Sequence, residues 1–200
     1  SNQINTPEFK QWFGDSKVVD KKGKPLVVYH GTTADLNSFD FTKLGLATGH
    51  KSSQMGSFFS SSPSVASSFS GEKFEGWPPK PTYNKGANVV SVYLSINNPI
   101  ELTAKEFLQR FVRDGESAKK FREEAQANGY DGVVIYKDKK LAESFGGEEY
   151  GADVWVAFEP NQIKSVFNKG TWSPESDFIL EKRVETEEII MDAARLDIDP

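Results

Sequence analysis

The chain has 200 residues (22.3 kDa); 37% of them are hydrophobic and 26% charged, the formal net charge is −5, and cysteine is absent. This length and composition predict one soluble globular domain with its own core, and the negative charge argues against a broad nucleic-acid-binding surface. The lack of cysteine excludes disulfides, thiolate nucleophiles and cysteine-based zinc sites, and no apolar segment is long enough to span a bilayer or to act as a secretion signal, so we expect a cytoplasmic protein without membrane attachment.

The N-terminal part of the chain predicts a helix followed by a hairpin. Thr6 can cap a helix over residues 6–14 that has a proline in its first turn and ends at Gly14. Residues 17–30 contain two β-rich runs around a Lys-Gly turn, which is the pattern of a β-hairpin. The polar, glycine-rich segment 33–57 has no sustained period and predicts mostly loop.

The middle of the chain predicts short strands separated by a helix and a loop. Residues 57–63 form a short strand pattern that ends in hydroxyl side chains. Pro63 then begins a helix that Gly71 closes. The segment 71–86 contains three prolines and predicts an extended loop, whereas residues 88–96 alternate and are rich in β-branched residues, as in a strand.

The C-terminal half predicts further helices and strands. A capping box of Thr103 and Glu106 opens a helix that runs to residue 112, and a second amphipathic helix spans 117–129. Three more strands are predicted over 131–136, 153–158 and 163–167. Solvated turns are expected at two lysine-rich runs, 21–24 and 137–140. The acidic C-terminal region predicts a helix over 185–196.

The order of these elements indicates the fold class. Helices are inserted between strands at irregular spacing, which is typical of an α+β fold and not of a doubly wound parallel sheet. No G-x-G-x-x-G or phosphate-binding loop sequence is present, so a Rossmann protein or a nucleotide triphosphatase would lack its phosphate site.

Three segments combine a strand with polar side chains at its end: "YHGT" (29–32), "GSFFSSSPSVASSFS" (56–70) and "DVWVAFEPNQIKSVF" (153–167). With "FKQWFGDSKVVDKKGKPLVVYHGT", "VYLSINNPIEL" and "GYDGVVIY", in this order and spacing, they resemble the ADP-ribosyltransferase fold of the histidine type, in particular the domains of phage and polyvalent mobile-element proteins. The resemblance covers roughly residues 8–175. It implies a split β-sheet core with inserted helices over 1–175, followed by an acidic C-terminal extension over 176–200.

The resemblance also implies an activity and a substrate. We expect a mono-ADP-ribosyltransferase that transfers ADP-ribose from NAD⁺ to a macromolecular acceptor, with protein preferred to nucleic acid, and that releases nicotinamide without a metal ion. One alternative is an NAD⁺ glycohydrolase, in which water is the acceptor. The other is a degenerate domain that binds NAD⁺ or a protein partner and catalyses nothing. A toxin, a phage factor and a delivered effector are all compatible with the sequence, and the sequence does not indicate the oligomeric state.

The first two segments contain the expected NAD⁺-binding residues. In the family resembled, the histidine that His30 matches hydrogen-bonds the adenosine-side ribose, with Thr32 in support. Gly31 has no Cβ, so its backbone N–H and C=O can approach the nicotinamide carboxamide. The second segment supplies an aromatic ring for nicotinamide and a neighbouring hydroxyl, and we expect these at Phe59 and Ser60. Phe69 on the following helix is a further candidate. Relatives commonly have tyrosine here, and phenylalanine keeps its π-face.

The third segment lacks the expected glutamate. Transferases of this fold place a glutamate at the start of the penultimate strand, where it stabilises the oxocarbenium-like transition state. That position falls at Asp153 or Val154 in this chain. Glu149, in the loop "GGEEYG", and Gln162 are the other candidates, and we rank Glu149, Gln162 and Asp153 nearly equal. Gln162 can alternatively brace the loop between two strands, and Glu149 can be solvated.

Overall fold

A mixed sheet forms the centre of the molecule. The structure is a computed structural model, and it describes residues 2–32, 38–44, 51–68, 72–75, 80–83, 88–145, 150–168, 170 and 172–180. Seven strands form the sheet: β1 (Val28–Thr32), β2 (Ser57–Ser60), β5 (Asn88–Leu94), β6 (Pro99–Thr103), β7 (Gly132–Tyr136), β8 (Val154–Ala157) and β9 (Ile163–Ser165). Their spatial order is β6-β7-β8-β2-β1-β5-β9, and β6 and β7 are the one parallel pair among the described strands. The predicted α+β class is confirmed.

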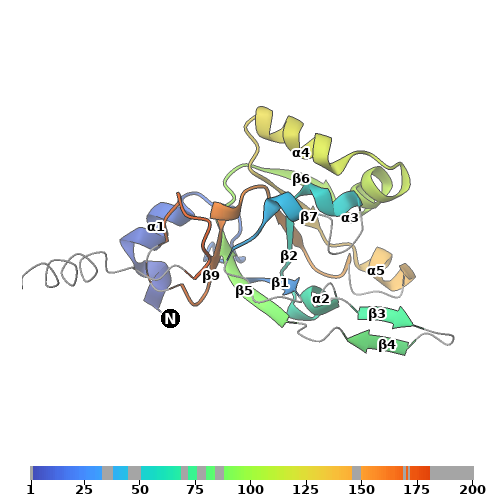
Figure 1. Cartoon of the computed structure of the whole chain (residues 1–200), viewed down its shortest axis with the longest axis horizontal. Helices are drawn as coiled ribbons and strands as arrows, with labels where there is room; N and C mark the ends of the chain where they lie inside the picture. The colour runs from blue at the N-terminus through green and yellow to red at the C-terminus, as the bar shows by residue number, and fades with distance from the viewer. Residues whose placement is uncertain are drawn as a thin grey trace, which may run out of the picture.

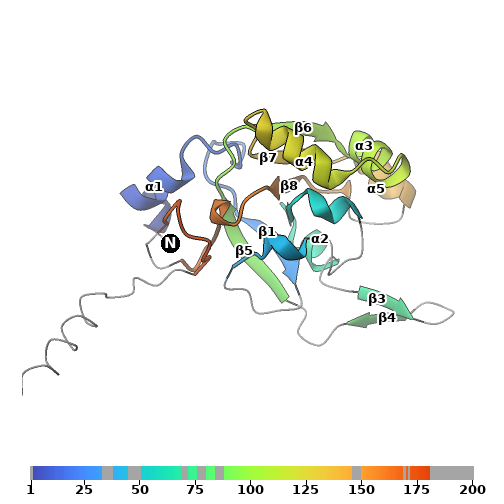
Figure 2. The same ribbon diagram turned by 45° about the horizontal axis from the view of Figure 1, so that its top comes forward.

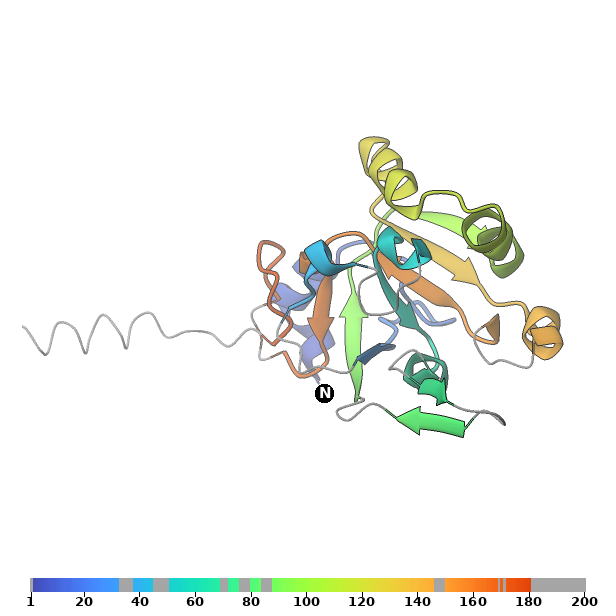
Figure 3. The same ribbon diagram turned by 45° about the vertical axis from the view of Figure 1, so that its right-hand side comes forward.

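The sheet is split between β1 and β2. β1 pairs with β5 along its whole length, and β2 pairs with β8 along its whole length. Within the described residues, β1 and β2 pair with each other only at Tyr29 and Ser60. The sheet therefore has two halves, β1–β5–β9 and β2–β8–β7–β6, whose strands run at a marked angle to each other (Figure 3).

The main hydrophobic core lies between the two halves. Val28, Val92 and Leu94 come from one half, and Phe59 and Trp155 come from the other. Each of these side chains is 7% exposed or less, and burial of such a side chain contributes about 1.5–3 kcal/mol. Because the two halves share few backbone hydrogen bonds, this core holds them together.

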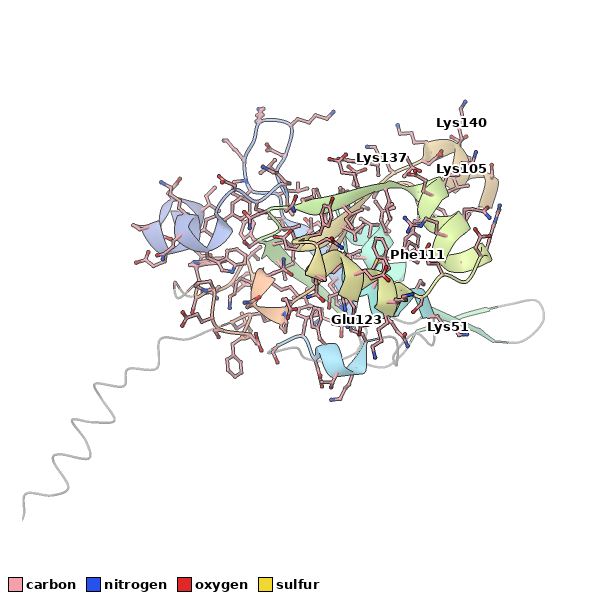
Figure 4. All side chains as sticks on the ribbon, turned by 90° about the horizontal axis from the view of Figure 1, so that it is seen from above. Lys51, Lys105, Phe111, Glu123, Lys137 and Lys140 are labelled. Carbon is pink, nitrogen blue, oxygen red and sulfur yellow. The ribbon has the colours of Figure 1, made fainter. Side chains whose placement is uncertain are left out.

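Helices cover the opposite face of the β6–β7–β8 half. They are α3 (Ala104–Phe107), the π-helical segment η4 (Leu108–Arg113), α4 (Ala118–Ala127) and α5 (Lys139–Phe145). The helices α3 and α4 lie over the β6–β7 part of the sheet (Figures 1 and 2). Phe111 and Ala125 share a second core with Val133 and Val156. Lys105, Lys137 and Lys140 extend outward at the end of this layer (Figure 4).

Several predicted helix ends are confirmed in atomic detail. Helix α1 (Pro7–Phe13) begins where the Thr6 hydroxyl accepts a hydrogen bond from the Phe9 N–H at 3.2 Å, and it ends at Gly14 with φ of 54°. The predicted capping box before α3 is present, because the Glu106 N–H donates to the Thr103 hydroxyl at 3.1 Å. Helix α2 (Pro63–Ser68) begins at the predicted proline. The helix expected over 185–196 lies outside the described residues.

Two predictions from the sequence are corrected. The hairpin over 17–30 is reduced to an isolated bridge between Val19 and Pro25, because β1 pairs with the distant β2 and β5. The loop over 71–86 contains β3 (Glu72–Glu75) and β4 (Lys80–Tyr83), which pair as a separate ribbon. Both strands of such a ribbon are edge strands, where a proline is tolerated although it has no N–H to donate.

Two further elements were not expected. The strand β6 has only five residues and starts with a proline, so it gives a weak strand signal. The helix α5 begins at Lys139, inside the run that predicts a solvated turn. The lysines of that run are exposed, as expected, and the helix packs on the second core through Leu141. In the described part of the chain, no helix is both long and apolar enough to cross a membrane.

After β9, the segment Trp172–Leu180 packs against the rest of the fold. Trp172 and Ile179 in this segment are each 1% exposed. Ile179 is part of the main core. An apolar side chain from the region after residue 175 therefore packs in the same core as the residues before it, and the domain boundary at residue 175 stays a prediction.

The turn between β8 and β9 is braced by one buried side chain. The Gln162 side-chain oxygen accepts hydrogen bonds from the N–H groups of Phe158 (2.9 Å) and Glu159 (2.7 Å). Its side-chain nitrogen donates to the carbonyls of Ser95 (3.0 Å) and Asp131 (2.8 Å). All four hydrogen-bonding positions of the amide are therefore used, and they join three separate segments of the fold.

We expect the substitution Gln162→Ala to destabilise the protein by roughly 3–5 kcal/mol, because it leaves several backbone groups of a 9%-exposed site without a partner. Urea unfolding measures this change. The control is Gln126→Ala, which removes a half-buried side chain whose hydrogen bond to Glu159 is exposed to solvent, and it should cost less than about 0.5 kcal/mol. Equal losses for the two variants would contradict the bracing role.

Candidate functional site

His30 lies where the two halves of the sheet separate. It follows Tyr29, the last residue of β1 that pairs with β2 in the described register. Its ring Nδ1 is 2.8 Å from the carbonyl oxygen of Phe58 on β2. A side-chain hydrogen bond thus joins β1 to β2 at the point where their backbone ladder stops.

The contacts of His30 define its protonation state. A carbonyl oxygen can only accept, so Nδ1 carries the hydrogen and donates it to Phe58. Burial against Phe39 and Phe59 is the main cause that lowers the pKa of His30 below 6.5, and the Phe58 carbonyl opposes it. The imidazole is therefore neutral at pH 7, and Nε2 has a lone pair that can accept a hydrogen bond.

Gly31 and Thr32 continue β1 past the separation point. They pair with Val89 and Asn88 on β5. Within the described residues, the register between β1 and β2 contains only Tyr29 and Ser60. Successive residues of a strand direct their backbone groups to alternate sides, so the backbone N–H and C=O of Gly31 face the same side as those of Tyr29.

The two phenylalanines of β2 face opposite sides of the sheet. Phe59 is 1% exposed, and its ring centroid is 5.3 Å from that of His30. Phe58 packs in the second core, with its ring 6.0 Å from that of Phe107. Phe59 is thus the one of the pair that lies beside His30, but its ring is enclosed by core side chains. Its assignment to nicotinamide stays a prediction.

The predicted hydroxyl side chain, Ser60, is buried beside the turn into α2. Ser60 is 2% exposed and its Oγ accepts a hydrogen bond from the Ser62 N–H at 3.1 Å, which shapes the turn into α2. Phe69 lies outside the described residues. Glu148 and Glu149, in the loop before β8, also lie outside them.

The described candidates for the residue that stabilises the transition state lie in different surroundings. Asp153 directly precedes β8, its carbonyl accepts from the Ser61 N–H at 2.9 Å, and one carboxylate oxygen accepts from the Lys137 N–H at 3.0 Å. It therefore lies at the end of β2 next to Ser60. Val154 packs in the second core. Gln162, as described above, is fully engaged with backbone groups.

Phe39 is the residue beside His30 that reasoning from the sequence missed. It is 7% exposed, and its ring centroid is 4.9 Å from that of His30 with an interplanar angle of 75°. The segment around it was assigned to a polar loop. A usable signal was the alternation of Phe39 and Phe41 between polar residues, since Phe41 also packs on the main core. Among the described residues, no group of three or more acidic or histidine side chains could hold a metal ion.

The comparisons with known proteins give one family. A family described as ADP-ribosyltransferase in polyvalent proteins matches residues 20–173, which include all three segments named above and most of the described fold. No match was found among curated proteins. The split sheet, the histidine at the split and this match agree, and we conclude that the chain belongs to the family of ADP-ribosyltransferases found in polyvalent proteins.

Proposed function

We propose that this protein is a mono-ADP-ribosyltransferase that transfers ADP-ribose from NAD⁺ to a protein acceptor. The observation that carries the proposal is the position of His30, a neutral histidine held by Phe58 at the separation of β1 from β2. Such a group can accept a hydrogen bond from a ribose hydroxyl without bringing a positive charge next to NAD⁺.

The binding step uses groups on β1. Nε2 of His30 accepts from a hydroxyl of the adenosine-side ribose. The backbone N–H and C=O of Gly31 bind the nicotinamide carboxamide along the strand edge that does not pair with β2. Both interactions use groups that the strand already holds in place, so little conformational entropy is lost on binding.

The chemical step breaks the bond between ribose C1′ and the nicotinamide nitrogen. The bonding electrons leave with nicotinamide, which becomes neutral, and C1′ develops positive charge. A nucleophile of the acceptor then attacks C1′ and gives up its proton. A carboxylate near C1′ stabilises the charge in the transition state, and we assign this role to Asp153 or Glu149. We give Gln162 an indirect role, since its amide has no capacity left for a ribose hydroxyl.

A non-catalytic NAD⁺-binding domain is the second candidate function. It is favoured by Val154, an apolar residue at the strand-start position, and by the Asp153 carboxylate, which is partly engaged by the Lys137 N–H. A glycohydrolase would use the same site with water as the acceptor. Labelled NAD⁺ in a cell lysate separates the three. Label on a macromolecule shows transfer, and its removal by protease supports a protein acceptor whereas its removal by nuclease indicates a nucleic acid. Free ADP-ribose indicates hydrolysis, and neither labelled macromolecule nor free ADP-ribose indicates binding only.

We expect NAD⁺ to raise the melting temperature of the protein, because a ligand at roughly 100 times its dissociation constant adds about 2.7 kcal/mol of stability. Thermal denaturation with and without millimolar NAD⁺ measures this. In His30→Phe the ring contacts with Phe39 and Phe59 are kept and both ring nitrogens are lost. This variant should fold but show little shift, and a shift like that of the wild type would contradict the binding role of His30.

The protonation of His30 predicts how stability and affinity depend on pH. The folded pKa is below the unfolded value of 6.5, so the unfolded state binds more protons between the two values. Stability should be complete above pH 6.5 and fall as the pH decreases through the folded pKa. The affinity for NAD⁺ should fall only as the pH approaches and passes below the folded pKa, because protonation of the folded His30 removes the Nε2 lone pair. Urea unfolding and calorimetry at pH 5–8 test both, and His30→Phe should lack the step in stability.

The carboxylate assignment is tested by nicotinamide release at saturating NAD⁺. If Asp153 stabilises the developing charge, Asp153→Asn should bind NAD⁺ normally and lose about 10²–10³ in rate. If Glu149 has this role, Glu149→Gln should show that loss and Asp153→Asn should be nearly silent. Wild-type rates in both variants would show that neither carboxylate acts on C1′.

A further inference from the structure

A buried lysine on the edge strand β9 donates hydrogen bonds to a segment that follows β9 in the chain. Lys164 is 0% exposed, and its Nζ donates to the carbonyls of Ser176 (2.5 Å) and Phe178 (2.9 Å). Burying an ammonium group is costly unless it is hydrogen-bonded, so these bonds tie the position of the two carbonyls to β9. We call the residues Ser176–Leu180 the C-terminal strap.

Additional bonds fix the same strap. The Ser165 N–H donates to the Ile179 carbonyl at 3.0 Å, and the Asn168 side-chain amide donates to that carbonyl at 3.2 Å. The Ile179 side chain is 1% exposed and enters the main core. Lys164 thus belongs to a set of polar side chains on and after β9 that hold the strap.

The C-terminal strap also contacts the segment whose next residue lies beside His30. Phe178 forms an antiparallel bridge with Ser38, and the next residue, Phe39, is the one whose ring lies edge-on to His30. Phe39 also contacts Phe59, at 5.4 Å between ring centroids, and shares the main core with Ile179. A continuous path of contacts therefore runs from Lys164 through the strap and Phe39 to His30.

We propose that Lys164 is a positioning residue for the NAD⁺ site, and that the C-terminal strap acts on His30 by holding Phe39 against its ring. His30 is half-buried, and Phe39 and Phe59 cover part of its ring, which favours the neutral Nδ1–H form and fixes the direction of Nε2. Release of the strap would let more water reach the imidazole and would loosen the acceptor geometry. The role of this site in NAD⁺ binding rests on the proposed function, whereas the link between the strap and His30 does not.

The first test is the titration of His30 by NMR in the full chain. The protein has only two histidines, His30 and His50, so comparison with His30→Phe assigns both ring signals. In Lys164→Met, which is unbranched but one atom shorter and which removes the charge and the donors, the pKa of His30 should rise toward 6.5 while that of His50 stays as in the wild type. The NAD⁺ dissociation constant should increase about tenfold, the effect of losing one hydrogen bond.

A matched pair of core variants controls for general loss of stability. Ile179→Ala and Ile96→Ala remove the same atoms from the same core, but Ile179 belongs to the strap and Ile96 does not. Ile179→Ala should shift the His30 titration as Lys164→Met does, and Ile96→Ala should leave it unchanged at a similar cost in melting temperature. This pair decides the question even if Lys164→Met does not fold.

The outcomes separate the two proposals. An unchanged pKa of His30 in the strap variants, or an equal shift in Ile96→Ala, overturns the positioning role. Wild-type protein that binds no NAD⁺ overturns the proposed function, and the His30 titration still decides whether the strap acts on His30. A shift confined to the strap variants together with weaker NAD⁺ binding supports both.

Discussion

The hydrogen bond from His30 to the Phe58 carbonyl is the interaction on which the rest of the site depends. Regular pairing of β1 with β2 would use that carbonyl in the ladder and would direct Gly31 toward a neighbouring strand. The backbone register instead stops at Tyr29 and Ser60, and the imidazole takes over the connection. One side chain therefore lets the strands diverge without leaving the Phe58 carbonyl unpaired. It also determines which nitrogen of that side chain is left to accept from a ligand.

The divergence explains where the stability of the fold comes from. Two half-sheets joined by a single residue pair have to be held by side chains, and the main core supplies them from both halves and from loops on either side. Glycine has a part in this arrangement: a Cβ at Gly56 would be 2.3 Å from the Ala157 carbonyl, so β2 begins in direct contact with β8. Close packing on one side of β2 thus accompanies the opening on the other side.

Much of the fold could be predicted from the sequence, because its signals are local. The caps at Thr6 and Thr103, the alternation before Leu94 and the strand that carries His30 each depend on neighbours in the chain. The partners of β1 were not predictable in this way, because a hairpin with residue 19 and a ladder with residue 89 require the same pattern. Pairing in the ribbon of β3 and β4 was hidden by prolines that only an edge strand tolerates.

The site was predictable only in part, for a related reason. His30, Gly31 and Thr32 are adjacent in the chain, and the motif that contains them was recognisable. Phe39 is not adjacent to His30 in the chain but contacts it in the fold, and the engagement of Gln162 with four backbone groups depends on segments around residues 95, 131 and 158. Whether a glutamine braces a loop or binds a ligand is decided by such distant partners, which a single sequence does not reveal.

The main core also has a consequence for the order of folding. It contains both Val18 and Ile179, which are far apart in the sequence. Contacts between residues so far apart close large loops and form slowly, and during synthesis Val18 emerges before Ile179 and waits for it. A nascent chain that ends before Ile179 has an open core next to Phe39 and His30. Completion of the core, and with it the surroundings of the histidine, therefore has to wait until Ile179 has been synthesised and has left the ribosome.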